Sequence, residues 1–254
     1  MSSISVVLAT FNEEKNLQDC LDSVKDFADE IVIVDGSSSD STIDIAKKLK
    51  ALIIVTNNPP IFHINKQKAI DKATKDWILQ LDADERVTPE LKKEILSVIN
   101  DKDNKNAGYW IPRKNWFLGR FLMKGGQYPD YTIRLYKRGK GRLPQKDVHE
   151  QAVVEGSVSY LKHPLIHIAD PDFGRYLLRF NRYTSLSAKE IRSKKINKSL
   201  LAPINYLLFK PVGWFIWTYL RHKGFMDSWQ GFIFSFFSSI HFPVSYIKSL
   251  KNEN

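Results

Sequence analysis

The chain has 254 residues, 43% of them hydrophobic, which suits one large domain or one domain with an appendage. Its single cysteine, Cys20, excludes an internal disulfide and favours a reducing compartment. Residues 1–172 hold 25 Lys and Arg against 25 Asp and Glu, whereas residues 173–254 hold 13 against 3, so the net charge of +10 lies entirely in the second part. We therefore expect two domains, 1–170 and 171–254, with different partners.

The first residues predict a strand rather than a targeting signal. Residues 1–14 contain an apolar run that is too short for a signal peptide and has no basic leader. We therefore expect the first domain to stay in the cytoplasm. Cys20 falls in a stretch with helical spacing of apolar residues, so we interpret it as a small buried side chain rather than a reactive thiol.

The first hundred residues alternate between two periodicities. Short, predominantly apolar runs predict strands at 4–8, 31–34, 52–55 and 77–81. Apolar residues at helical spacing predict helices at 14–24, 40–49, 65–73 and 88–99, the last of which opens with Thr-Pro-Glu, a typical capped start. Apolar strands between amphipathic helices predict an α/β fold, a mostly parallel sheet with both faces covered.

The pattern changes after Ala107. Further strands are expected at 109–111, 132–136, 151–154 and 158–161, as a mixed or antiparallel continuation of the sheet. Residues 113–130 are rich in aromatic residues and glycine and predict a long functional loop. After residue 170 the chain is basic and aromatic, and helical stretches are expected at 173–192, 200–220 and 228–250.

Three of the predicted strands end in polar or acidic residues, and ligands of parallel sheets bind beyond the carboxyl ends of strands. These ends are Thr10-Phe11-Asn12-Glu13, Asp35-Gly36-Ser37-Ser38-Ser39-Asp40 and Asp82-Ala83-Asp84-Glu85. In an extended turn, Asp82 and Asp84 can point to one side and share a hard cation with substrate phosphates. Such a cation neutralises charge on a leaving diphosphate. A solvated turn is the other interpretation, and the position after a buried strand favours the metal site.

Asp35 fits two roles. Its carboxylate can accept hydrogen bonds from a base or ribose, as acidic residues at strand ends do for nucleotides. Alternatively it caps the following turn, with Gly36 supplying an unusual φ. Asp40 fits a capping role better than a ligand role.

These three motifs, in these spacings, resemble the family 2 glycosyltransferases. Gly125-Gly126-Gln127-Tyr128-Pro129-Asp130, Ile133-Arg134-Leu135-Tyr136 and Val148-His149-Glu150 extend the resemblance to the bacterial subgroup that builds lipopolysaccharide cores, which includes β-glucosyltransferases acting on a core heptose. The resemblance implies a GT-A fold, an inverting mechanism, a UDP-sugar donor with glucose as the expected sugar, and Mg²⁺ or Mn²⁺.

The resemblance also assigns roles to individual residues of the donor site. Thr10 and Glu13 would line the nucleotide pocket, and Asp35 would contact the uracil. Asp82 would contact the ribose or the metal, and Asp84 would ligate the metal.

An inverting single displacement needs one general base, which takes the proton from the attacking hydroxyl. Other members of the wider family use an acidic residue of a Glu-Asp pair, which this sequence lacks in the corresponding region. We assign the base to Glu150, with Asp147 and His149 as its nearest rivals. His149 also fits a substrate-binding role or a structural hydrogen bond.

Two basic and three aromatic residues complete the candidate site. Lys66, at the start of a helix, can reach the diphosphate or can simply belong to a solvated helix face. Arg134 can pair with a phosphate on the acceptor or can be an edge-strand charge. Trp110, Trp116 and Tyr128 can stack on sugar faces, and packing explains each of them equally well.

The basic tail has two apolar stretches. Residues 229–247 contain no charged residue, if histidine is neutral, and approach the length of about 17–20 residues needed for a spanning helix. Internal Gln, Pro and Ser residues argue against spanning. Basic and aromatic flanks instead predict helices that lie in the interface of an anionic membrane, at the cytoplasmic face of the inner membrane, peripheral or monotopic. The alternatives are a helical subdomain packed on the core and a nucleic-acid partner, and the tail is too apolar for the latter.

Three functions fit these observations. The leading one is a metal-dependent glycosyltransferase that uses a lipopolysaccharide-core or other lipid-linked acceptor. A nucleotidyltransferase would be expected to carry a glycine-rich phosphate loop after the first strand, and residues 10–13 contain no glycine. A sugar-nucleotide-binding membrane protein without turnover is the third, and the intact Asp82, Asp84 and Glu150 argue against it.

Overall fold

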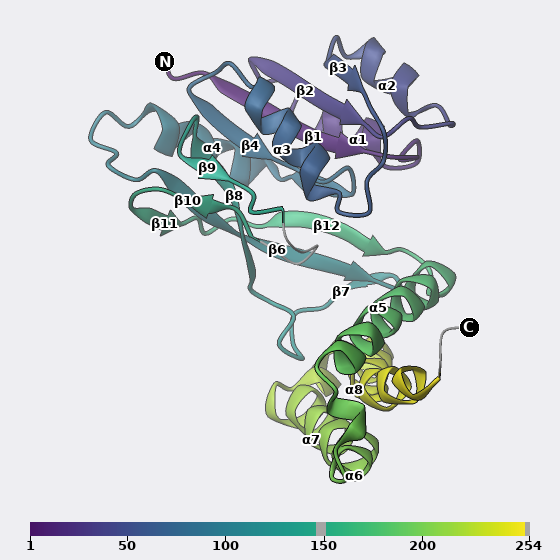
Figure 1. Cartoon of the computed structure of the whole chain (residues 1–254). Helices are drawn as coiled ribbons and strands as arrows, with labels where there is room; N and C mark the ends of the chain where they lie inside the picture. Colours follow the sequence, from purple (N-terminus) through teal and green to yellow (C-terminus); the bar gives the residue numbers. More distant parts are fainter. Residues whose placement is uncertain (146–150, 252–254) are drawn as a thin grey trace. The chain divides into compact units, whose positions relative to one another are not determined.

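The computed structural model describes residues 1–145 and 151–251, which form two compact units (Figure 1). Unit 1 comprises Met1–Arg113 and Tyr131–His167, and unit 2 comprises Lys114–Asp130 and Ile168–Asn254. The predicted base Glu150 and its rivals Asp147 and His149 lie outside the described residues.

A mixed sheet forms the centre of the fold. Its strands run in the order β3-β2-β1-β4-β8-β6-β12-β5, with β11 and β7 paired to β6, while β9 and β10 form a separate pair. The strands are β1 Ile4–Thr10, β2 Glu30–Asp35, β3 Leu52–Val55, β4 Trp77–Gln80, β5 Glu85–Val87, β6 Gly108–Phe117, β7 Arg120–Phe121, β8 Asp130–Lys137, β9 Gly141–Arg142, β10 Val153–Val154, β11 Val158–Tyr160 and β12 Leu165–Asp170. β3, β2, β1 and β4 are parallel, and β8 joins β4 antiparallel, which confirms the predicted mostly parallel α/β sheet with a mixed continuation.

Helices cover both faces of the parallel part of this sheet. They are α1 Leu17–Asp22, α2 Thr42–Lys48, α3 His63–Lys72 and α4 Pro89–Asn100. One buried cluster joins apolar residues of α1, α2 and α4 to Ile4, Val6 and Leu8 of β1. A second cluster joins α3 to Val7 of β1 and Val32 of β2, because successive side chains of a strand alternate between the two faces of the sheet. Figure 1 shows where these helices lie along the sheet. The covered sheet therefore has the apolar strands that the sequence predicts.

The edges of the sheet differ from the prediction. β3 is an edge strand, so Leu52 and Val55 are about half exposed rather than buried. Neither β5 nor β12 is predicted by the sequence. The expected loop over 113–130 begins inside β6 and includes β7, because Trp116 and Phe117 pair with Phe121 and Arg120 in a short hairpin.

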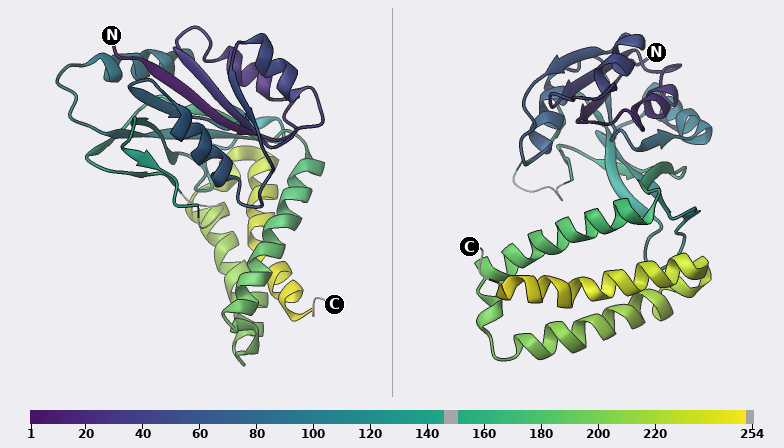
Figure 2. Two further views of the ribbon diagram at one scale, coloured as in Figure 1. Left: turned by 45° about the horizontal axis from the view of Figure 1, so that its top comes forward. Right: turned by 90° about the vertical axis from the view of Figure 1, so that its right-hand side faces the viewer.

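Unit 2 contains long packed helices (Figure 2). α5 spans Phe173–Ser193 and α8 spans Ser228–Leu250. The helical stretch between them consists of α6 Ala202–Ile204, the π-helix η2 Asn205–Phe209, α7 Lys210–Phe215 and the π-helix η3 Ile216–Arg221. A 3₁₀ turn lies on each side of this stretch, η1 Ile196–Lys198 before it and η4 Gly224–Asp227 after it. α5 and α7 both pack on α8. Among the described residues, no helix has both the length and the apolar character needed to cross a membrane.

A buried carboxylate holds the hairpin region of unit 2 against its helices. Asp227 accepts a hydrogen bond from the backbone N–H of Lys124 at 2.6 Å, and its side chain is almost fully buried. The N–H of Gly125 donates to the carbonyl of His222 at 2.9 Å. The glycine-containing segment after β7 is therefore anchored at defined points.

Candidate active site

The carboxyl ends of three parallel strands bring the predicted residues to one edge of the sheet. β1 lies between β2 and β4, and Thr10 at the end of β1 pairs with Asp35 at the end of β2. On the other side, the N–H of Leu81 donates to the carbonyl of Val7 at 3.0 Å, so Asp82 follows directly beyond β4. The register of the strands therefore gathers the three motifs.

Asp35 caps its own turn in this structure. Its carboxylate is fully buried and accepts hydrogen bonds from the hydroxyls of Thr10 at 2.8 Å and Ser38 at 2.7 Å, and from the N–H of Ser38 at 2.7 Å. The capping interpretation is therefore visible in the structure, and the contact with a uracil stays a prediction.

The turn after β2 corrects the role given to Gly36. The left-handed residue is Ser37, with φ 66°, and Gly36 is not among the residues with positive φ. Gly36 is instead required for close approach, because an added Cβ would lie 2.9 Å from the Cβ of Asn58.

Asp40 and Glu13 tie the loop after β1 to the start of α2. Asp40 accepts a hydrogen bond from the N–H of Thr42, the first residue of α2, at 3.0 Å. Desolvation opposes its ionisation, but its hydrogen bonds with Thr42 lower the pKa of Asp40 overall. The N–H of Glu13 donates to the Thr42 hydroxyl at 2.8 Å, and its carboxylate accepts from Asn16 at 2.8 Å. The predicted capping role of Asp40 agrees with these contacts.

A buried ionic network surrounds Asp82. One carboxylate oxygen pairs with the ammonium of Lys66, and the other accepts from Nη2 of Arg134 at 2.6 Å. The same Nη2 lies 2.8 Å from Oε1 of Glu85, which is fully buried, and Oε2 of Glu85 accepts from the N–H of Asp82 at 2.9 Å. Nη1 of Arg113 lies 3.4 Å from Glu85. The Asp-x-Asp turn is therefore fixed from both its backbone and its side chain.

The charges of this network control the ionisation of Asp82. Desolvation alone would raise the pKa of this carboxyl, but Arg134 and Lys66 more than compensate and hold the pKa of Asp82 well below its usual value. Desolvation lowers the pKa of Lys66, and the attraction of Asp82 opposes this shift. Asp82 is consequently an anion at neutral pH.

The positions of Lys66 and Arg134 differ from the simple interpretations of the sequence. Both side chains are buried, so Lys66 does not belong to a solvated helix face. Arg134 lies on β8, between β4 and β6, so it is not an edge-strand charge. Both cations face Asp82, and their contacts with a donor or acceptor phosphate stay predictions.

Asp84 lies beside a histidine that the sequence did not indicate. Oδ2 of Asp84 is 3.6 Å from Nε2 of His167, and both side chains are more than four-fifths buried. His167 reaches this position because β12 pairs antiparallel with β5, where His167 is opposite Glu85. No short-range motif marks a residue so far along the chain.

The Asp84–His167 pair fits a divalent cation as a partial ligand set. Carboxylate oxygen and imidazole nitrogen are common metal ligands, and two atoms that each lie about 2.1 Å from one ion are at most about 4.2 Å apart. Within residues 1–145 and 151–251, no group of three or more His, Cys, Asp or Glu could hold a metal. Remaining ligands would come from substrate phosphates and water, as is usual for Mg²⁺.

The predicted sugar-stacking aromatics already have protein partners. Trp110 stacks on Tyr160 with ring centroids 6.3 Å apart, and Trp116 meets Phe121 edge-to-face at 4.8 Å. The ammonium of Lys114 lies 6.0 Å from the ring centroid of Tyr128. Packing thus accounts for these contacts, and sugar stacking stays a prediction.

Comparisons with known proteins identify the class of enzyme that this fold and strand-end site define. A family model described as glycosyl transferase family 2 matches residues 5–154. The chain is 28% identical to the lipopolysaccharide core biosynthesis glycosyltransferase LpsC of Rhizobium meliloti, over 93% of this chain and 90% of that protein. It is 26% identical to an uncharacterised glycosyltransferase of Rickettsia typhi, over 100% of this chain and 90% of that protein.

Among solved structures, S. aureus TarS is similar with a TM-score of 0.49 and 19% identity, over 74% of this chain and 39% of the TarS chain. The chain thus spans about two fifths of TarS. It spans 90% of LpsC and 90% of the Rickettsia typhi glycosyltransferase. It belongs to glycosyltransferase family 2.

Proposed function

We propose that this glycosyltransferase moves a hexose, expected to be glucose, from a UDP-sugar to a lipopolysaccharide-core or other lipid-linked glycan, with inversion and with Mg²⁺ or Mn²⁺. The name of LpsC supports a glycan acceptor of the lipopolysaccharide core. The observation that carries the proposal is the fixed turn after β4, where Lys66 and Arg134 hold Asp82 while Asp84 faces His167.

The donor site divides its work between two groups of residues. Thr10, Glu13 and Asp35 stand at the ends of β1 and β2, where they would bind the nucleoside. Asp84 and His167 would hold the divalent cation, with Asp82 as the second carboxylate of the motif. A bound cation there supplies charge neutralisation for the departing diphosphate. The ionic network supplies preorganisation, because the turn is held before the substrate arrives.

The acceptor side requires a group that removes a proton. As the acceptor oxygen bonds to the anomeric carbon, its proton passes to a carboxylate and the bond to the diphosphate breaks on the opposite face. Glu150 is the proposed base. Replacing Glu150 with Gln removes the proton acceptor without changing size, so transfer should be lost while UDP binding persists.

A membrane-bound acceptor agrees with the charge of the chain. Residues 173–254 hold 13 basic against 3 acidic residues, and anionic lipids attract such segments. We accordingly propose that the protein acts at the cytoplasmic face of the inner membrane.

The test is calorimetric titration of UDP with and without Mn²⁺, on the wild type, Asp84→Asn and the matched surface variant Asp103→Asn. Asp103 is exposed and outside the site. We expect Mn²⁺ to strengthen UDP binding in the wild type and in Asp103→Asn, and Asp84→Asn to lose this dependence. Binding that is indifferent to Mn²⁺ in all three proteins would refute the metal role.

A coupled assay for released UDP, with lipid-linked acceptors and a panel of UDP-sugars, then tests turnover. Acceptor-dependent release by the wild type but not by Glu150→Gln would support the proposal. Tight UDP binding without acceptor-dependent release would instead support a sugar-nucleotide-binding protein.

A further inference from the structure

The middle helical stretch of unit 2 exposes its large apolar residues and buries smaller or more polar ones. Between Ala202 and Arg221, the buried residues are Ala202, Tyr206 and Thr218. Phe209 is 63% exposed and Trp217 is 51% exposed. A helix on a water-exposed protein surface shows the reverse pattern, with its apolar stripe turned inward.

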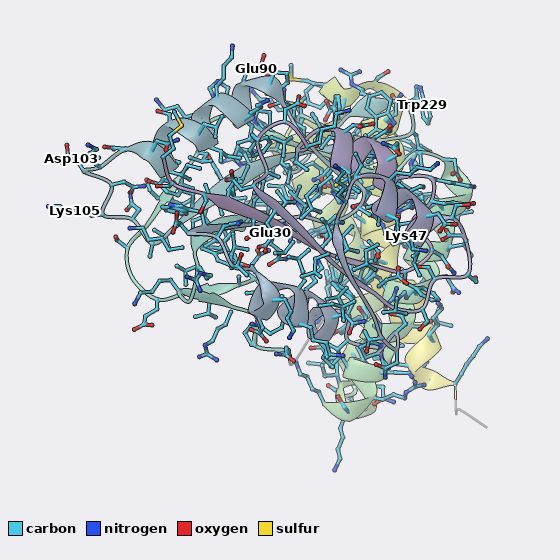
Figure 3. All side chains as sticks on the ribbon, turned by 90° about the horizontal axis from the view of Figure 1, so that it is seen from above. Glu30, Lys47, Glu90, Asp103, Lys105 and Trp229 are labelled. Atoms are coloured by element: carbon cyan, nitrogen blue, oxygen red, sulfur yellow. The ribbon has the colours of Figure 1, made fainter. Side chains whose placement is uncertain are left out.

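α8 has the same inverted pattern. Its buried positions are mostly small or polar, namely Gln230, Gly231, Ser235, Ser239, Ser245, Tyr246 and Ser249. Trp229, by contrast, is 56% exposed, and its side chain points away from the ribbon (Figure 3). Phe232 and Phe236 are exposed as well and stack on each other with centroids 6.1 Å apart.

Small residues allow close backbone approach where the chain passes from η3 through η4 into α8. A Cβ added at Gly231 would lie 1.9 Å from the carbonyl oxygen of Gly224, and one added at Gly224 would lie 2.9 Å from the carbonyl oxygen of Thr218. Helix contacts made through Gly, Ala, Ser and Thr, with large apolar residues outside, are typical of helices surrounded by lipid, where burying apolar surface between helices gains little.

Basic residues lie against aromatic rings of the middle helical stretch, one ring buried and one half-exposed. The ammonium of Lys210 lies 3.7 Å from the ring centroid of Tyr206, and the guanidinium of Arg221 lies 5.9 Å from the ring centroid of Trp217. Long basic side chains of this kind can keep their charge at the headgroups while their stems lie along apolar surface. Together with the 13 basic against 3 acidic residues of 173–254, this charge favours an anionic lipid surface over a neutral partner.

We propose that the apolar outer surface of unit 2, represented by Leu208, Phe209, Trp217, Leu220, Trp229 and Phe232, inserts into the acyl-chain region of an anionic membrane. This deepens the membrane part of the proposed function, because it makes the attachment hydrophobic insertion rather than electrostatic adhesion. It does not depend on which sugar or acceptor the enzyme uses.

The experiment is vesicle flotation of the full-length protein, using equal parts of phosphatidylethanolamine and phosphatidylglycerol. The bound protein is washed in about 1 M salt, where the Debye length is about 3 Å, and then in detergent. The test variant is Phe209→Ser with Trp217→Ser. The matched control is Val153→Ser with Tyr160→Ser, which removes two similarly exposed apolar residues from unit 1.

We expect the wild type to survive the salt wash and to be released by detergent. Losing the insertion of each half-exposed side chain should weaken partitioning about fivefold, so the double variant should lose about 25-fold, and the control should change less than about twofold. Circular dichroism and a cooperative melt must match the wild type for both variants. If the test variant fails to fold, Phe209→Ser alone, with about fivefold expected, replaces it.

Release of the wild type by salt alone would overturn the proposal in favour of electrostatic adhesion. Flotation of the test variant equal to that of the wild type would also overturn it. So would a concentration-dependent dimer in detergent-free buffer that does not bind vesicles, because a second copy would then cover the surface. Failure of UDP binding or transfer with intact flotation would count against the proposed catalytic function alone.

Discussion

Replacing Arg134 with Met tests whether the network around Asp82 has the energetics assigned to it. Arg134 is 6% exposed and contacts Asp82 and the fully buried Glu85. Its removal leaves the carboxylate of Glu85 with the hydrogen bond from the N–H of Asp82 and the longer ionic contact to Arg113. Breaking a buried ion pair from one side typically costs about 3–5 kcal/mol. Since Asp82 retains Lys66 and is 27% exposed at its side chain, most of this loss should come from Glu85.

Urea unfolding at pH 7 measures this loss, with Arg138→Met as the matched control. Arg138 lies in the turn directly after β8 and is exposed, so its replacement should change stability by no more than about 0.5 kcal/mol. Adding Glu85→Gln to Arg134→Met removes the unpaired charge. The double variant should therefore lose less unfolding free energy than the sum of the losses in Arg134→Met and Glu85→Gln.

The pH dependence gives a second readout of the same variant. In the wild type the pKa of Asp82 is lowered, so its contribution to stability is present above its unfolded pKa of about 3.9 and is lost as pH falls through the folded value. Without Arg134 the partly buried carboxyl should protonate more readily. The stability difference between the two proteins should therefore narrow as pH falls from 7 towards 4. A loss at pH 7 below about 1 kcal/mol, or one that is independent of pH, would refute the network as described.

Two further predictions concern packing and the single thiol. A Cβ at Gly141 would lie 2.3 Å from the ring of the fully buried Tyr136, so Gly141→Ala should destabilise by about 1–3 kcal/mol. Gly213 lies in α7 with nothing within 4 Å of an added Cβ, so Gly213→Ala should leave the stability unchanged or raise it by up to about 1 kcal/mol. Equal shifts of the melting temperature for Gly141→Ala and Gly213→Ala would contradict the packing argument. Cys20 is fully buried, and burial raises the pKa of its thiol. A thiol-reactive dye should therefore label Cys20 only when the protein unfolds. Rapid labelling of the native protein at pH 8 would contradict this prediction.

The parallel half of the fold could be predicted because its signals are local. Strands buried on both faces are predominantly apolar, and the helices between them show the periodicity of apolar residues that marks a covered helix. The start of α4 is an example of a local capping signal, since the hydroxyl of Thr88 accepts a hydrogen bond from the N–H of Leu91. The missed strands lack such signals. β5 is only three residues long, and β12 takes its place in the sheet by pairing with β6 and β5, which lie far from it in the sequence.

The same distinction explains what could be predicted of the site. Strand ends gather at one edge in any parallel sheet, so Thr10, Asp35 and Asp82 could be placed together from sequence. The partners of these residues could not, because His167 arrives through an antiparallel register and Arg134 through the pairing of β8 with β4. Nothing in Ile133-Arg134-Leu135 distinguishes a surface charge from a buried one.

The two aspartates of the Asp-x-Asp turn have different contacts in the structure. The sequence predicts that both point to one side and share a cation, whereas here Asp82 contacts Lys66 and Arg134, and Asp84 lies beside His167. Within the network Asp82 and Glu85 offset the positive charges of Lys66 and Arg134, and Arg113 adds one further positive charge beside Glu85. Because the two carboxylates offset Lys66 and Arg134, we assign most of the neutralisation of a diphosphate to a cation held by Asp84 and His167, while Asp82 keeps the turn in place.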